Sequence, residues 1–195
     1  MKATDIPVIA FSVGEEELAG VDTKPLVGHL AAWSYFQSVN TPENKAFIAK
    51  WRAYTKNPKR VTNDPMESAY IPFHMWVQAV QQAGTTDVEA VRQAMIGRKV
   101  KSPSGFEVVM GSNHHMAKPV MIGEVQADGQ FSIVYKSKAL PPKAWSPYVE
   151  ANKGRSPIGH GQGCVAAVRH RDLQRTDLLR CQADGSDPVT ATLSA

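Results

Sequence analysis

Residues 104–135, SGFEVVMGSNHHMAKPVMIGEVQADGQFSIVY, constrain the fold more than any other part of the chain. They read as three short runs with apolar residues at alternate positions, the first of them at Phe106, Val108 and Met110. Asp128-Gly129 separates the last two runs, and this pair is the strongest short-range hairpin signal because glycine accepts the positive φ of a tight turn. We therefore predict a β-hairpin over residues 121–135.

The same block carries an adjacent histidine pair, His114 and His115, which we place in a loop over residues 111–119. Neighbouring residues in an extended chain point to opposite faces, and no Cys, Asp or Glu lies within four residues of the pair to complete a ligand set. The pattern favours a structural, hydrogen-bonding loop over a metal site. A metal-dependent enzyme using these histidines, His74 or the two cysteines remains an alternative hypothesis.

The N-terminal third predicts the start of an α/β domain. Residues 6–11, IPVIAF, form a short continuous apolar run, which is typical of a parallel strand buried on both faces. A short helix is expected from Glu15, where acids in the first turn favour the helix dipole, and a second strand over residues 28–36. Small ligands bind at such carboxyl ends of strands in open α/β sheets.

Three helices are predicted next. Thr41 is expected to cap a helix through residue 54, with Pro42 in its first position. The same arrangement recurs with Asp64 as the cap and Pro65 in the first position of a second helix, which Gly84 stops. An interior proline removes a backbone hydrogen bond, so Pro72 predicts a kink or a shortened first segment. A third helix is expected over residues 87–96. The residues expected to face inward are Phe47, Ile48, Trp51 and Tyr54, then Tyr70, Phe73, Val77 and Val80, then Val88, Val91 and Met95; His74 is expected to pack.

Composition excludes some classes of function. The charge of +4 comes from 22 basic and 18 acidic residues, and the basic ones cluster only at Lys56, Lys59 and Arg60, so we expect no nucleic-acid partner. No run of 18 apolar residues occurs, and the first residues do not read as a signal peptide.

The composition changes near Arg155. Residues 156–195 contain no Lys, no Glu and no aromatic residue, but they hold both cysteines, Cys164 and Cys181. Their spacing, with lone histidines between them and before them, is a weak zinc pattern. Without aromatic residues the segment has little apolar surface to bury, so we expect residues 151–195 to be an atypical, poorly ordered tail, loosely helical around residues 165–180.

Four stretches together carry a family resemblance: residues 6–54, residues 69–97, residues 102–131 and WSPYVE at residues 145–150. They resemble the C-terminal part of the urea-binding proteins of bacterial ABC transporters and, more loosely, amide-sensing regulators. The resemblance runs from Asp5 to Arg155 and does not extend to the tail. Pro72 stands where we expect a small residue in that family.

The resemblance implies an α/β type I periplasmic-binding fold, in which two lobes close on a small ligand, present here in part. Residues 1–62 would belong to the second lobe and residues 63–103 would supply helices of the first. Residues 104–150 would form the hinge crossover and second-lobe strands, with the histidine loop near the hinge.

The same resemblance implies a non-enzymatic solute-binding component of an ABC transporter, periplasmic, with permease subunits as partners and no cofactor. Ser12 and Val13 match the position from which relatives offer a hydroxyl or backbone groups to the amide, and Glu15 is a further candidate acceptor. Urea has one acceptor oxygen and four N–H donors, so its pocket needs fixed acceptors and few donors. We expect this chain alone to bind urea very weakly or not at all. The alternative is an amide-sensing regulator that docks a partner protein.

Overall fold

A computed structural model describes residues 2–146, 148–155, 179–181 and 189–191, the last two segments by their backbone alone. The chain divides into two compact units, Met1–Pro142 and Lys143–Ala195, which are described separately. Among the described residues, no helix has both the length and the apolar character needed to cross a membrane.

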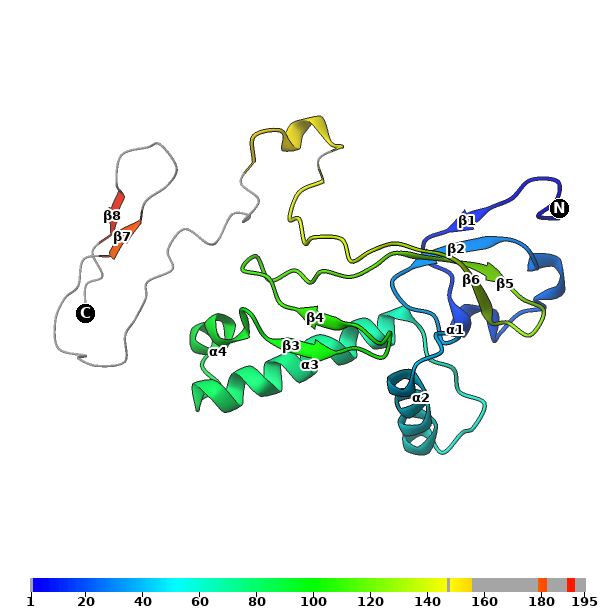
Figure 1. Cartoon of the computed structure of the whole chain (residues 1–195), viewed down its shortest axis with the longest axis horizontal. Coiled ribbons are helices and arrows are strands. Elements are labelled where there is room, and N and C mark those ends of the chain that lie inside the picture. The colour runs from blue at the N-terminus through cyan, green and yellow to red at the C-terminus, as the bar shows by residue number, and fades with distance from the viewer. Residues whose placement is uncertain (1, 147, 156–178, 182–188, 192–195) are drawn as a thin grey trace. The chain divides into compact units, whose positions relative to one another are not determined.

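The first unit is built on a four-stranded sheet with the order β1-β2-β5-β6 (Figure 1). The strands are β1 (Ile9–Ala10), β2 (Leu30–Trp33), β5 (Met121–Val125) and β6 (Phe131–Lys136). β1 and β2 are parallel, and the other pairs are antiparallel. The predicted hairpin is therefore confirmed as β5–β6, and Gly129 in its turn has a φ of 76°. The mixed α/β class is also confirmed.

One apolar core lies against this sheet and the short helix α1 (Glu15–Leu18). Phe36 and Phe131 are its largest members, and their rings lie 4.7 Å apart between centroids. The rest of the buried cluster consists of Leu18, Ala31, Val39, Met121 and Val125.

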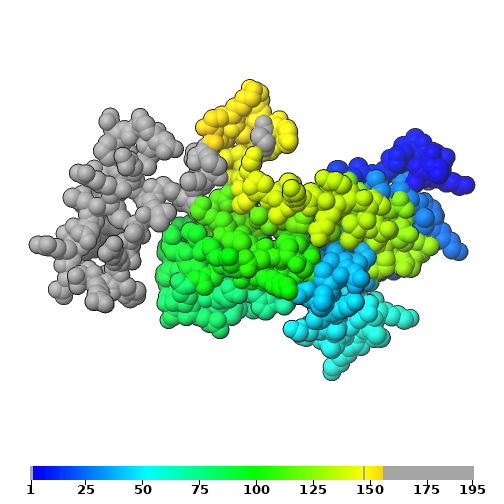
Figure 2. All heavy atoms as spheres, in the orientation of Figure 1, coloured from blue at the N-terminus to red at the C-terminus, as the bar shows by residue number. Residues whose placement is uncertain are grey.

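The prediction that residues 6–11 are buried on both faces is wrong. β1 does pair in parallel with β2, but it is the edge strand, and Ile6, Val8 and Phe11 are 56%, 51% and 71% exposed. The N-terminal segment, dark blue in Figure 2, accordingly lies on the surface of its unit. An apolar run predicts a strand, but burial depends on neighbours that the run itself does not specify.

Helix α2 (Pro42–Thr55) begins as predicted, because the Thr41 hydroxyl accepts a hydrogen bond from the Asn44 N–H at 3.1 Å. Phe47, Ile48 and Trp51 are half-buried. Tyr54, which was expected on the same face, is 82% exposed and stacks on Trp51 at the end of the helix.

Helix α3 (Asp64–Ala83) differs from the predicted helix in its N-cap and in part of its buried face. Its N-cap is Asn63, whose side chain accepts from the Met66 N–H, so Asp64 is already the first helical residue. The helix runs through Pro72 without ending, and it stops at Gly84 as predicted. Its buried residues are Glu67, Ile71, Met75 and Ala79.

The inward face predicted for α3 is right only in part. Tyr70 packs against the core that contains Ile71 and Met75, and Val77 and Val80 are half-buried, but Phe73 is not buried. Phe73 is 59% exposed, and it lines an apolar groove of about 470 Å³ between α2 and α3 together with Phe47, Trp51, Met66, Ala69 and Tyr70. His74 packs against Tyr70 at 4.2 Å between ring centroids, as expected.

A second core joins α3 to a small antiparallel sheet of β3 (Lys99–Lys101) and β4 (Glu107–Val109). It contains Ile71 and Met75 from the helix and Val100, Val108 and Met110 from the sheet region. Helix α4 (Val88–Met95) also packs on α3 and buries Val91, but Val88, which was expected to face inward, is 73% exposed.

The second unit contains, within its described residues, the 3-10 turn η2 (Glu150–Asn152) and an antiparallel pair, β7 (Leu179–Cys181) and β8 (Val189–Ala191). Arg180 thus lies in a strand where a loose helix was expected. The rest of that expectation lies outside the described residues.

Candidate functional site

The carboxyl ends of β1 and β2 meet at one edge of the sheet, and the predicted ligand-binding residues Ser12 and Val13 lie there. Ser12 is exposed and Val13 is half-buried. The Val13 carbonyl accepts a hydrogen bond from Trp33 Nε1 at 2.8 Å, which fixes the loop after β1 to the end of β2. The Gly14 N–H donates to Glu17 Oε2 at 2.8 Å, so this first-turn acid holds the helix start. The Ser12 hydroxyl is therefore exposed at this edge.

A buried ion pair borders the same edge, and no local sequence pattern predicts it. Lys118 Nζ lies 2.8 Å from Glu67 Oε2 and 4.0 Å from Asp64 Oδ2, and the Lys118 side chain is 12% exposed. Asp64 Oδ2 accepts the Ser34 N–H at 2.9 Å, which ties the start of α3 to the residue after β2. Glu67 Oε1 accepts the Ser104 hydroxyl at 2.7 Å. Lys118 therefore holds together α3, β2 and the loop before β4.

Glu15, the third predicted ligand-binding residue, does not share the surface of Ser12. Its side chain is 1% exposed, and Oε1 accepts the Gln37 N–H at 2.6 Å. Oε2 has no hydrogen-bond partner among the described residues. Burial raises the pKa of Glu15 from its ordinary 4.5 to about 7; the Gln37 hydrogen bond opposes this, and nearby Asp64 adds to it.

A chain of buried polar side chains continues from Gln37. Its amide donates to Gln130 Oε1 at 2.8 Å and accepts from the Thr62 N–H at 2.8 Å. Tyr35 Oη lies 2.7 Å from both Thr62 Oγ1 and Asn44 Oδ1, and burial raises the pKa of Tyr35. These bonds satisfy polar groups that would otherwise destabilise the core.

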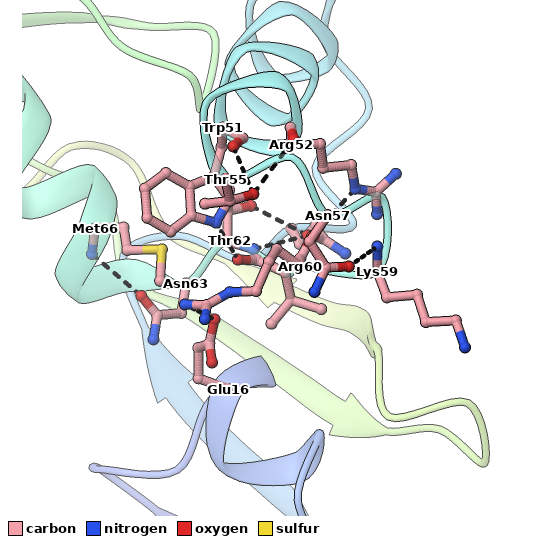
Figure 3. A network of polar contacts seen from close by, with 12 residues as sticks. Glu16, Trp51, Arg52, Thr55, Asn57, Lys59, Arg60, Thr62, Asn63 and Met66 are labelled. Carbon is pink, nitrogen blue, oxygen red and sulfur yellow. Dashed lines mark hydrogen bonds and ion pairs between the residues drawn. The ribbon is translucent and has the colours of Figure 1, made fainter.

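Of the basic cluster Lys56, Lys59 and Arg60, the Arg60 side chain is held within the fold, whereas both lysines are exposed (Figure 3). The Arg60 guanidinium lies over the Trp51 ring at 5.5 Å and pairs with Glu16 at 3.1 Å. Its carbonyl accepts from Arg52 Nε, and the neighbouring Val61 carbonyl accepts from Trp51 Nε1 at 2.9 Å. The loop between α2 and α3 is thereby anchored to α2 and α1.

The histidine pair lies in the loop predicted for it. His114 has a φ of 57°, and burial lowers its pKa, with Arg92 and His115 adding to the effect. His115 Nδ1 lies 2.8 Å from the Asn113 carbonyl. Among the described residues, no group of three or more His, Cys, Asp or Glu side chains is placed to hold a metal ion. Cys164 lies outside them, and Cys181 is described by its backbone alone.

The buried carboxyl predicts a pH-dependent stability. Between about pH 4.5 and pH 7 the native state holds a proton on Glu15 that the unfolded chain releases, so the free energy of unfolding falls as the pH rises through this window. Glu15→Gln cannot ionise, and we expect it to stabilise the protein at pH 8 by on the order of 2 kcal/mol while changing little at pH 4. Calorimetric unfolding of both proteins across this range checks the result. A parallel pH dependence in the two proteins would contradict it.

A parallel strand pair that leads into a helix start and leaves a hydroxyl exposed at its carboxyl edge is the arrangement of a ligand-binding α/β domain. The chain belongs to the periplasmic binding protein domain family, which it matches over residues 1–151.

Similar proteins agree with this membership at the level of the fold. A solute-binding protein of an ABC transporter from Rhodopseudomonas palustris HaA2, solved with p-hydroxybenzoic acid, is 25% identical, with a TM-score of 0.61. The match covers 71% of this chain and 39% of that one. The amino acid ABC transporter substrate-binding protein from Pseudomonas fluorescens Pf-5 is 20% identical, with a TM-score of 0.58, over 71% of this chain and 40% of that one.

A curated relative, named limonene hydroxylase, from Geobacillus stearothermophilus, is 32% identical over 120 residues. This match covers 62% of this chain and 22% of the relative, so the chain spans less than a quarter of that protein. The name describes the relative and carries no reaction over to this chain.

Proposed function

We propose that this chain is part of the solute-binding component of an ABC transporter, acting in the periplasm by binding and not by catalysis. The family match over residues 1–151 is the observation that carries the proposal. The permease subunits of the transporter are its proposed protein partners. In this proposal residues 1–62 belong to the second lobe, residues 63–103 supply first-lobe helices and residues 104–150 form the crossover.

The proposed ligand is urea or a short-chain amide. The resemblance of residues 6–54 to urea-binding proteins supports this choice, whereas the two solved relatives described above bind p-hydroxybenzoic acid or belong to an amino acid transporter. Ser12 is exposed at the edge and its hydroxyl can both donate to an amide oxygen and accept from an amide N–H. In this proposal the half-buried Val13, next to Ser12, would also contact the amide. Glu15 was also predicted to contact the amide. Its carboxyl is buried and does not share the exposed surface of Ser12, so that contact remains a prediction.

The chain spans 39% of the p-hydroxybenzoate-binding relative, so we expect it to provide only part of a two-lobed pocket. Titration of the ¹⁵N-labelled full chain with acetamide and urea should shift the backbone amide signals of Ser12 and Val13 with weak, roughly millimolar affinity. Ser12→Ala should weaken that response by about fivefold, since one hydrogen bond is lost. Ser132→Ala is the matched control, because Ser132 is also exposed but lies on β6 in register with Glu124, which pairs with Leu30 at the start of β2.

Three outcomes would contradict the proposal. Micromolar urea binding by this chain in calorimetry would show a complete pocket. An equal response of the Ser12 and Val13 signals to benzoate and leucine would remove the amide specificity. Shifts that survive Ser12→Ala unchanged would place the ligand elsewhere.

The looser resemblance to amide-sensing regulators supports a second candidate, a sensor that docks a partner protein. The full gene distinguishes the two: a signal peptide ahead of this region supports transport, and its absence supports sensing.

A further inference from the structure

A second pocket, of about 230 Å³, lies between α1, the following segment and the β5–β6 turn. The β5–β6 turn lies beside the N-terminal end of β2, since the Gly28 N–H bonds the Val125 carbonyl, whereas Ser12 follows the carboxyl end of β1. Neither Ser12 nor Val13, the residues of the proposed amide surface, lines this pocket. Its lining consists of Glu15, Leu18, Ala19, Val21, Thr23, Val61, Ala127, Asp128, Gly129 and Gln130.

Three donors of this lining are used within the protein. The Thr23 hydroxyl donates to the Ala127 carbonyl at 2.7 Å, and the Gln130 N–H donates to Asp128 Oδ1 at 3.0 Å. The Gly129 N–H donates to the Gln126 carbonyl at 3.1 Å. Each carbonyl or carboxylate oxygen can accept more than one hydrogen bond, so the Ala127 carbonyl and the Asp128 carboxylate keep acceptor capacity.

Glu15 is the group that points to a ligand. It is 1% exposed, it lines the pocket, and its Oε2 has no partner among the described residues although Oε1 is bonded to the Gln37 N–H. An unpaired buried oxygen of a carboxyl group carries a desolvation cost that a bound donor would remove.

The charges around the pocket favour a positively charged ligand as that donor. Glu15 and Asp128 are the ionisable groups of the described lining, which contains no Lys, Arg or His. Burial of Glu15 disfavours its ionised form, and the nearby Asp64 and Glu17 add to this effect. The Glu15 charge in turn helps to raise the pKa of Tyr35. Two basic residues adjoin the lining in sequence. Arg60, beside Val61, is paired with Glu16, and Lys24, beside Thr23, is exposed to solvent. A bound cation would offset this excess of negative groups.

We propose that this pocket binds a small organic cation with N–H groups, of the size of methylammonium or guanidinium, and that Glu15 is its anionic partner. Leu18, Val21 and Val61 would contact the apolar part of the cation, and the Asp128 carboxylate would face its charge from the turn. Because the cation requires an ionised Glu15, whose pKa is about 7, its binding competes with a proton and strengthens as the pH rises.

Methylammonium chloride, titrated into the full ¹³C- and ¹⁵N-labelled chain, tests the proposal. We expect saturable shifts of the Glu15 carboxyl and Gln130 amide signals, with affinity about a hundredfold higher near pH 8 than near pH 5. Glu15→Gln, which keeps an acceptor for the Gln37 N–H, should weaken binding by about tenfold or more, and Asp128→Asn by about threefold. Glu107→Gln, an exposed site on β4, is the charge-matched control and should bind as the unchanged protein does.

Tetramethylammonium chloride and potassium chloride at the same ionic strength complete the design. The first lacks N–H donors and the second lacks an organic part, so neither should give the saturable shifts. The proposal would be overturned by an equal response to either salt or by the lack of any saturable response to methylammonium. Full methylammonium binding by both Glu15→Gln and Asp128→Asn would also overturn it. The Ser12 and Val13 signals report the amide surface separately, so failure of one proposal is distinguishable from failure of the other.

Discussion

Replacing Lys118 by methionine should destabilise the protein by about 3–5 kcal/mol, because the change leaves the charge of Glu67 buried without its partner. The Glu67 side chain is 0% exposed and lies 2.8 Å from Lys118 Nζ. Ser104 and Ser68 also bond to this pair, so three segments lose a shared contact. The free energy of unfolding, from scanning calorimetry near pH 7, is the measurement.

Two further variants separate the buried pair from an ordinary surface pair. Lys99→Met removes a cation from an exposed pair with Glu107, in which both side chains are more than half exposed, and should cost less than about 1 kcal/mol. The double variant Lys118→Met, Glu67→Gln removes both charges and should recover a large part of the loss. Equal losses for the two lysine variants would contradict the assignment of Lys118 as a buried charge partner.

Replacing Gly123 by valine should destabilise the protein by roughly 3 kcal/mol, the upper end of the usual cost of overpacking a core. A Cβ at Gly123 would lie 2.7 Å from Phe36 Cζ and 2.9 Å from Phe131 Cβ, and both distances are shorter than non-bonded carbon atoms allow. β5 would have to move away from β6 at the centre of the sheet. Calorimetric unfolding also measures this change.

Gly20→Ala is the control, because a Cβ there would meet no atom closer than 3.9 Å and Gly20 does not have a positive φ. It should change the unfolding free energy by less than about 0.5 kcal/mol. Phe36→Leu removes part of the ring that the new side chain meets, so its combination with Gly123→Val should cost less than the sum of the single changes. Additive costs would indicate that the two positions do not compete for the same space.

The elements that the sequence predicted are those with strong local signals. The Asp128-Gly129 turn, the Thr41-Pro42 helix start and the Gly84 stop all depend on a few neighbouring residues, and all three lie where they were predicted. The Asp64-Pro65 start was displaced by one residue, because the Asn63 side chain caps the helix. Pro72 did not end its helix, since the core formed by Ile71 and Met75 on both sides of it supports the helix through that position.

Burial was harder to predict than secondary structure. On α3 the aromatic residues suggested one face, but Ile71, Met75 and Ala79 face the core because β3 and β4 lie on that side. Only β4 was predicted there, and β3 is too short for its pattern to stand out. For β1 the apolar run was predicted to be buried on both faces, but the strand lies at the edge of its sheet.

The candidate sites divide in the same way. Local sequence pattern was sufficient to predict the α/β class, the hairpin, the loop that holds His114 and His115, and the strand end at which Ser12 and Val13 lie. The tertiary structure alone decided that Glu15 turns inward with an unpaired oxygen, that Lys118 and Glu67 form a buried pair, and that Arg60 is bound to Glu16. These contacts join residues between 22 and 51 positions apart, as for Glu15 with Gln37 and Glu67 with Lys118, and no local pattern specifies which distant charges meet.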